Sequence, residues 1–500
     1  MEKIIEPYNK TIFGHPIGLF VLFFTELWER FSYYGMRAIL VLYLVSETSG
    51  INPGLGWSDK SALELYGWYT MFVYLATIPG GILADRYLGQ RKSVMIGGLL
   101  LCFGHGILAV EALWAFYTGL TFIVLGVGCL KGNISTMVGG LYDKNDHNKR
   151  DMGFYIFYMG INVGAASAAL LVGWIGESFN WHYGFGLAGI GMALGQLGYW
   201  KGQKYLKHVG NKIESKNNEN QNSTNLFLQI FKKTNSLLGF LLTACLGIYI
   251  GINGSWDYGL LIIGIAFAVG FAIVVYNDGN RVEKDRILVT YLAFLIVIVF
   301  WGSFEQAGGL MNLYAFQKTD LALGTFMVPA SWFQSVNAIF ILIFATAVGS
   351  FWIWWKKSGF EHSSLFKMAL GVVIMGFGFF FMSIAASEVT YDNDGNVLEK
   401  SAMYWLVLAY LFHTIGELCA SPVALSFITK LAPARWGAFL MGAYFAATGL
   451  GNKVAGKIGE NASDIGDYWT FTGITIFCTV FGLLVILILK PLKRLVHDAE

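Results

Sequence analysis

The chain has few charged residues, which disfavours a soluble protein. Asp, Glu, Lys and Arg make up 13% of its 500 residues, whereas a soluble domain has about 25%. The formal net charge is only +2. A charge so close to neutral argues against a nucleic-acid partner, because proteins that bind nucleic acid carry strongly basic surfaces.

Cysteine is also scarce. The five cysteines are scattered at positions 102, 129, 245, 419 and 478, mostly within apolar segments. No pair has the spacing of a disulfide framework or a metal site, so we expect no metal and no cofactor. Residues 1–18 are polar and lack the short apolar core and small-residue cleavage site of a secretory signal peptide. The first apolar segment is therefore interpreted as a membrane span.

Long apolar runs, in contrast, recur along the whole chain. Runs of about 20 residues are typical of transmembrane helices, which satisfy their own backbone hydrogen bonds. The polar stretch 201–225 and the charged break 277–286 divide these runs into groups of six, two and six. The sequence predicts an all-α membrane protein with 14 spans, divided into residues 1–203, a linker at 204–286 and residues 287–500. The two linker spans are expected to be peripheral.

Lys and Arg predict the orientation. With a cytoplasmic N-terminus, most of the 34 Lys and Arg residues fall on the cytoplasmic side, as the positive-inside rule requires. Both termini are then cytoplasmic. Two six-span halves joined by a cytoplasmic linker resemble the major facilitator superfamily, and the loop 81–92, GILADRYLGQRK, resembles its loop between spans 2 and 3. Such helical repeats place the substrate between the halves, near the membrane midplane.

Seven charged residues lie deep inside the predicted spans, where each costs about 2.5–3.5 kcal/mol. Together they would cost on the order of 20 kcal/mol if unpaired, so they must face one another or a water-filled cavity. They are Glu26, Glu29, Arg30, Arg37, Lys131, Glu305 and Glu417. The first four share one face of their helix with Tyr33, because positions 26, 29, 30, 33 and 37 follow the helical repeat.

Four carboxylates stand against three cations in this set, and one proton would make it neutral. That balance suits a proton-coupled carrier, although static pairs that only hold helices together are an alternative.

Other polar and aromatic residues also have two interpretations. Tyr33, Tyr34 and Tyr74 could contact a ligand or serve packing, and Trp301 could line a cavity or fill the core. Asn162 and Asn337 could bind a ligand or join helices, and His413 favours packing.

Several motifs resemble the proton-dependent oligopeptide transporter family, within the major facilitator superfamily. ELWERFSYYGMR (26–37) resembles its E-x-x-E-R-F-x-Y-Y signature, and FYMGINVGA (157–165) resembles its F-Y-x-x-x-I-N signature. GCLKGNIST, FEQAGG, SWFQSVN and IGELCASPVALS follow in the order and spacing of the family. The resemblance covers residues 12 to 490 and is to the bacterial type, which implies a multi-pass protein of the cell inner membrane. The two linker spans are extra to the basic twelve.

The resemblance implies proton-driven import of di- and tripeptides by a protein that is not an enzyme, with protons and membrane lipid as its other partners. Arg37 and Lys131 would hold the peptide carboxylate and Glu417 the amino group. Asn162 and Asn337 would hydrogen-bond the backbone of the peptide. The pocket would be lined by Tyr33, Tyr34, Tyr74 and Trp301. Glu26, Glu29 and Arg30 would couple transport to protons. A pair between Arg37 and Glu305 would gate the outer side. The chemistry fits independently, because a zwitterionic peptide needs a cation at one end and a carboxylate at the other.

The chain departs from the family at two informative positions. Gly67 stands where some members carry a histidine linked to proton handling, and Gly132 stands where a proline is usual. The alternatives within transporters are another small anion or a modified amino acid, although nitrate has no amine for Glu417. A membrane enzyme or a non-transporting sensor is a different class, but the chain has no nucleophile elbow, metal spacing or phosphate-binding loop.

Overall fold

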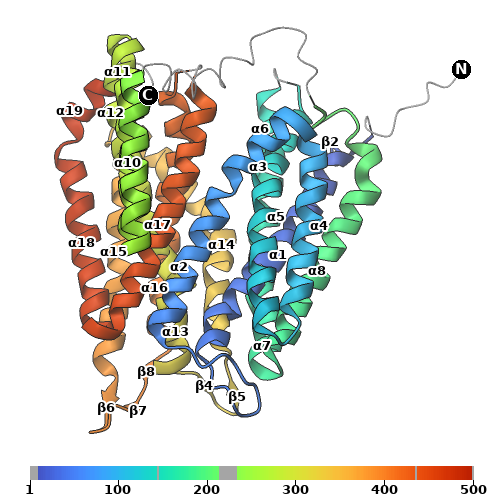
Figure 1. The fold of residues 1–500 in the computed structure, drawn as a ribbon, viewed down its shortest axis with the longest axis vertical. Coiled ribbons are helices and arrows are strands. Elements are labelled where there is room, and N and C mark those ends of the chain that lie inside the picture. Colours follow the sequence, from blue (N-terminus) through green and yellow to red (C-terminus); the bar gives the residue numbers. More distant parts are fainter. Residues whose placement is uncertain (1–9, 144–145, 213–233, 434–435, 498–500) are drawn as a thin grey trace, which may run out of the picture.

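A computed structural model describes residues 10–143, 146–212, 234–433 and 436–497. The structure is built from long helices that form two bundles with a helical hairpin beside one of them (Figure 1). Part of the predicted linker, residues 213–233, lies outside the described residues. The described chain therefore agrees with the expectation of an all-α protein.

Over the described residues, the first bundle contains six long helices, three of which are continued or interrupted by short turns. Its elements are α1 (Ile17–Val45), α2 (Asp59–Leu75) with α3 (Thr77–Leu83) and the π-turn η2 (Ala84–Leu88), α4 (Gln90–Leu108), α5 (Leu113–Gly140), α6 (His147–Ala168) with the π-turn η3 (Ala169–Gly173) and α7 (Trp174–Ser178), and α8 (Trp181–Gly202) with the 3₁₀ turn η4 (Gln203–Tyr205).

The hairpin and the second bundle follow. The hairpin consists of α10 (Thr234–Asn253) and α11 (Trp256–Asp278). The second bundle contains α12 (Arg281–Phe304), the 3₁₀ turn η6 (Glu305–Ala307), α13 (Leu310–Lys318), the 3₁₀ turn η7 (Ala330–Trp332), α14 (Phe333–Lys357), α15 (Ser364–Glu388), α16 (Tyr404–Leu431), α17 (Gly437–Ile465), α18 (Asp467–Leu487) and α19 (Leu489–Val496).

The described strands are only two or three residues long and lie before α1 or in connections between helices. They pair as β1 (Thr11–Ile12) with β2 (His15–Pro16), β3 (Thr319–Asp320) in parallel with β8 (Ser401–Ala402), β4 (Ala322–Leu323) with β5 (Phe326–Met327), and β6 (Thr390–Tyr391) with β7 (Val397–Glu399). They add no layer to the helical architecture.

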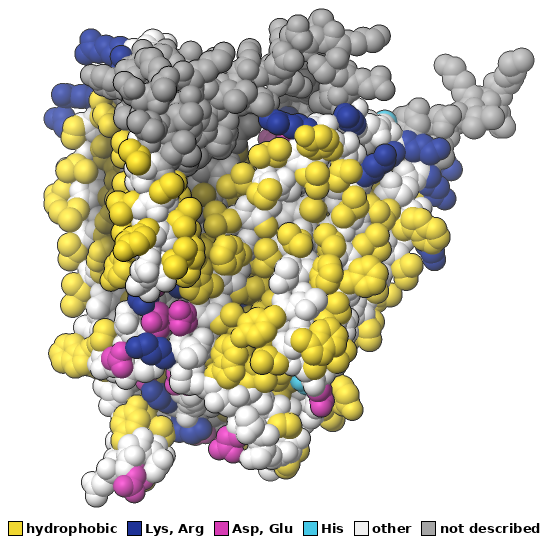
Figure 2. Space-filling view, in the orientation of Figure 1, with side chains coloured by type: hydrophobic (Ala, Val, Ile, Leu, Met, Phe, Trp, Pro, Cys, Tyr) yellow, Lys and Arg dark blue, Asp and Glu magenta, His cyan; other side chains and the backbone are white. Residues whose placement is uncertain are grey.

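The surface suits a membrane. Among the described residues, eight helical segments are long and apolar enough to cross a bilayer. Figure 2 shows hydrophobic side chains over the side of the molecule, whereas Lys and Arg gather at the end that bears α19 and β2. We call this the basic end and the opposite end, which bears β4 to β7, the outer end.

One predicted boundary falls inside a helix. We placed the start of the C-terminal half at residue 287 because the preceding residues are charged, but α12 begins at Arg281. Asn280 caps this helix, since its side chain accepts from Glu283 N while Glu283 accepts from Asn280 N. Such a capping box starts a helix in polar sequence, so α12 begins before its apolar part.

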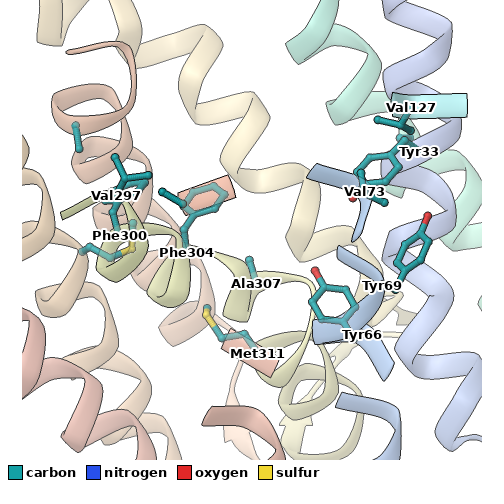
Figure 3. Packing of buried hydrophobic residues seen from close by; sticks show 14 of the residues in the cluster. Tyr33, Tyr66, Tyr69, Val73, Val127, Val297, Phe300, Phe304, Ala307 and Met311 are labelled. Atoms are coloured by element: carbon teal, nitrogen blue, oxygen red, sulfur yellow. The ribbon is translucent and has the colours of Figure 1, made fainter. Parts of the chain in front are cut away.

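The two bundles share a buried core where they meet. Residues from α2 and neighbouring helices lie opposite residues from α12, η6 and α13 (Figure 3). A close backbone approach joins α2 of the first bundle to α17 of the second. A Cβ atom added at Gly456 would lie 2.5 Å from Gly67 Cα, and one added at Gly67 would lie 2.9 Å from Gly456 Cα. The two helices therefore touch through glycines.

The hairpin supplies a carboxylate to the second bundle, which we did not anticipate when we predicted that the two linker spans are peripheral. Asp257, in the first turn of α11, lies 3.0 Å from the buried Lys453 and 3.4 Å from Lys457, both on α17. Lys453 also lies 4.1 Å from the centre of the Trp68 ring on α2. Lys453 is thus a buried charge outside the predicted set, and its carboxylate partner comes from the hairpin.

Candidate functional site

The charged stripe of α1 forms a compact triad. Arg30 lies between two carboxylates, with its Nε 3.1 Å from Glu26 Oε1 and in direct contact with Glu29. All three side chains are buried. The contacts follow from the sequence, because residues three and four apart face each other on a helix. Two carboxylates share one guanidinium here, so this triad holds the carboxylate in excess.

A second ion pair joins the two bundles. Arg37 Nη1 lies 3.0 Å from both carboxylate oxygens of Glu305. Tyr66 on α2 donates a hydrogen bond of 2.8 Å to Glu305 Oε2. Glu305 is positioned for this because α12 ends at Phe304 and the 3₁₀ turn η6 begins with Glu305. The structure thus brings together the two residues that the family resemblance pairs, and it adds Tyr66, which we did not anticipate.

Glu417 has only neutral hydrogen-bond partners among the described residues. Asn337 on α14 donates to Glu417 Oε2 at 2.9 Å and to Thr414 Oγ1 at 3.0 Å. Asn337 therefore joins α14 to α16, which is one of its two predicted roles. His413 is buried and packs with its ring 4.5 Å from that of Phe379, but neither ring nitrogen has a hydrogen-bond partner among the described residues. Thr414 was missed because a threonine in an apolar helix gives no specific signal.

Lys131 is the cation of the predicted set without a carboxylate partner. Its Nζ lies 3.8 Å from the centre of the Tyr74 ring, and no described carboxylate lies within 4.0 Å of it. The side chain is half-buried. A cation over an aromatic face is held in place while its charge stays available.

The remaining predicted residues have local partners. Tyr34 contacts the Tyr33 ring and lies beneath Arg37, whose guanidinium is 4.8 Å from the Tyr34 ring centre. Trp301 is half-buried and packs edge-on against Phe304 at 5.2 Å. Asn162 donates to Tyr158 O within its own helix at 3.0 Å, so it joins no second helix through this bond.

The two glycines that depart from the family pattern have different environments. Gly67 packs on Gly456, and a histidine side chain has no room between α2 and α17. Gly132 has open space, since an added Cβ would meet nothing within 4 Å. Helix α5 continues through Gly132 to Gly140. Only the first departure is therefore explained by close packing.

Of the seven predicted charges, five form ion pairs with one another and two have no ion-pair partner in the described part of the chain. The two are Lys131 in the first bundle and Glu417 in the second.

Comparison with known proteins adds to this geometry: residues 91–466 match the family model described as the POT family. The chain belongs to the POT family. The resemblance inferred from the motifs is thereby confirmed.

Individual POT relatives match nearly the whole chain. A di-/tripeptide transporter of Lactococcus lactis subsp. cremoris is 36% identical over 98% of this chain and 99% of its own length. The peptide transporter YePEPT of Yersinia enterocolitica is 35% identical over 99% and 98%. A crystal structure of a peptide transporter POT in complex with sulfate superposes with a TM-score of 0.84 at 34% identity, covering 98% of each chain. The predicted major facilitator fold is confirmed.

Proposed function

We propose that this POT protein is a proton-coupled symporter that imports di- and tripeptides by alternating access between its two bundles. The observation that carries the proposal is that Lys131 and Glu417 have no ion-pair partner among the described residues and belong to opposite bundles. A zwitterionic peptide supplies the missing partner to each. Its carboxylate would bind Lys131 and its ammonium group Glu417, which draws the bundles together.

The other site residues take supporting roles in this proposal. Arg37 adds to the carboxylate site when Glu305 releases it, and the Arg37–Glu305 pair gates the outer end. Asn162 and Asn337 bind the peptide backbone. The walls are formed by Tyr33, Tyr34, Tyr74 and Trp301. The basic end faces the cytoplasm of a cell whose inner membrane holds the protein.

Proton coupling falls to the triad of Glu26, Glu29 and Arg30. With both carboxylates ionised the triad carries one negative charge, and one proton makes it neutral. A buried group that can change between these two states can link protonation to the position of α1. One proton moving inward across about 100 mV releases about 2.3 kcal/mol, and one pH unit adds about 1.4 kcal/mol. Together they support a concentration ratio of roughly 500 per proton.

The test is uptake of labelled di-alanine and tri-alanine into proteoliposomes, with and without an inward proton gradient. We expect the gradient to drive accumulation of both. Glu29→Gln should abolish this accumulation and retain exchange of peptide across the membrane. Glu64→Gln, at an exposed position of α2, is the matched control and should behave like the unaltered protein.

Peptide accumulation that is the same with and without the proton gradient would refute proton coupling. Exclusion of both peptides together with uptake of a small anion or a modified amino acid would favour the alternative substrates within the family. No flux of any solute, with peptide binding retained, would instead favour a sensor.

A further inference from the structure

The two bundles meet at the outer end through a second carboxylate, which lies on α7. Glu177 accepts hydrogen bonds from Ala330 N and Ser331 N, each 2.9 Å long. The hydroxyl of Ser331 also donates to Glu177 Oε1. Ala330 and Ser331 form the 3₁₀ turn η7 that leads into α14, so one side chain of the first bundle binds the start of a helix in the second.

The position of Glu177 is fixed from its own side. Asn52, in the connection between α1 and α2, donates to Gly176 O at 2.7 Å and to Glu177 O at 3.3 Å. Asn52 Oδ1 also accepts from Trp181 N at 3.1 Å, at the start of α8. The short helix α7 is thus tied to both neighbouring segments of the first bundle, and the carboxylate is held in place before it meets η7.

The close approach of the bundles here depends on a glycine. A Cβ atom added at Gly173, at the end of η3, would lie 2.0 Å from Ser331 Oγ. Any side chain at this position would push η7 away from η3 and α7. The η3 backbone at Gly173 therefore lies directly against the Ser331 side chain, whose Cβ would be 2.8 Å from the added atom.

The first N–H groups of a helix have no acceptor within the helix, and its N-terminus favours a negative charge. Glu177 supplies that acceptor to η7 and α14 only while the bundles are together at the outer end. We propose that Glu177 is a latch that holds the outer end closed during the transport cycle, in addition to the Arg37–Glu305 pair. This role rests on the alternating access of the proposed function.

The latch has access to water. A cavity of about 420 Å³ is lined by Glu177 and Ser178 of the first bundle and by residues of the second, including Asp320 and Lys400. Water in this cavity can hydrate the carboxylate as it leaves η7. Opening then exchanges protein hydrogen bonds for hydrogen bonds to water, so the latch is reversible.

The test measures the distance between the bundles at the outer end. Spin labels are attached to Ile51→Cys and Leu323→Cys, both highly exposed and on opposite bundles, after the five native cysteines are replaced. Double electron–electron resonance without peptide gives the populations of closed and open forms. Glu177→Ala should lower the ratio of closed to open form at least tenfold, and Glu177→Gln, which keeps one acceptor oxygen, should lower it less.

Glu388→Ala is the matched control. Glu388 also accepts from a backbone N–H, at Ala402, and from a side chain, Trp405, but both lie in its own bundle. Its loss should leave the ratio unchanged. Gly173→Ala provides an independent route and should open the outer end while Glu177 is intact.

An unchanged ratio in monodisperse Glu177→Ala and Gly173→Ala protein would overturn the proposal, as would an equal shift in Glu388→Ala. The measurement needs neither peptide nor a proton gradient. A failure of peptide uptake would therefore refute the proposed function without affecting the distances, and unchanged distances with normal uptake would refute only the latch.

Discussion

Lys131 and Glu417 should recognise opposite ends of a peptide, and this can be tested by removing one charge on each side. The changes are Lys131→Gln and Glu417→Gln. Glutamine has the size of glutamate and keeps one acceptor oxygen, so Asn337 can still donate to position 417. Each variant then loses its charge and keeps a polar side chain.

The expected magnitude follows from the partners in the structure. Neither charge has an ion-pair partner among the described residues, so a peptide terminus gains a hydrogen bond to a charged group. Such a bond contributes about 1.5–3 kcal/mol, which corresponds to roughly a 10- to 150-fold change in Kd. A charge already paired within the protein would contribute less, because the ligand would have to displace its partner.

The assay is a matrix of binding constants for Ala-Ala, N-acetyl-Ala-Ala and Ala-Ala-amide. Glu417→Gln should weaken binding of Ala-Ala and its amide and leave the N-acetylated peptide unchanged. Lys131→Gln should weaken Ala-Ala and the N-acetylated peptide and leave the amide unchanged. Glu388→Gln, away from the two charges, should change none. Equal losses for all three peptides in either variant would refute the assigned polarity.

Three further predictions concern the Arg37–Glu305 pair and the two glycines that depart from the family pattern. Glu305→Gln leaves Arg37 buried without its charged partner, and breaking a buried pair costs about 3–5 kcal/mol. The outer end should therefore open, which the distance between the two spin labels at that end would measure. Gly67→Ala brings a Cβ to 2.9 Å from Gly456 Cα and should lower the Tm, since overpacking costs about 1–3 kcal/mol. In Gly132→Ala the added Cβ has no neighbour within 4 Å. The Tm should stay the same or rise, because alanine is favoured over glycine in a helix by about 1 kcal/mol. An equal drop in Tm for Gly67→Ala and Gly132→Ala would contradict both predictions.

The local part of the site was predictable and the long-range part was not. The spacing of Glu26, Glu29 and Arg30 indicated one helical face, because contacts three and four residues apart are set by the helix itself. The charge count likewise indicated one excess carboxylate, and the structure places it in this triad. Composition and spacing could not pair Arg37 with Glu305, which are far apart in sequence. That pairing came from the family resemblance.

Other contacts escaped sequence reasoning for identifiable reasons. Tyr66 was missed because its role depends on a hydroxyl meeting Glu305 across the bundle contact. Lys453 was missed because its partner, Asp257, lies at the start of a hairpin helix that resembles an ordinary apolar span. Glu177 was missed because its acceptor role is directed at backbone N–H groups, which carry no sequence signal.

The contact between Gly67 and Gly456 also restricts how this protein can change. Each glycine excludes a side chain at the other position, because an added Cβ on either side meets the opposite Cα at 2.9 Å or less. A histidine at position 67 therefore cannot be introduced as an isolated substitution without displacing α17. If α1 handles the proton as proposed, mutational routes that would transfer this role to α2 are epistatic, since they require the helix crossing to be rebuilt first.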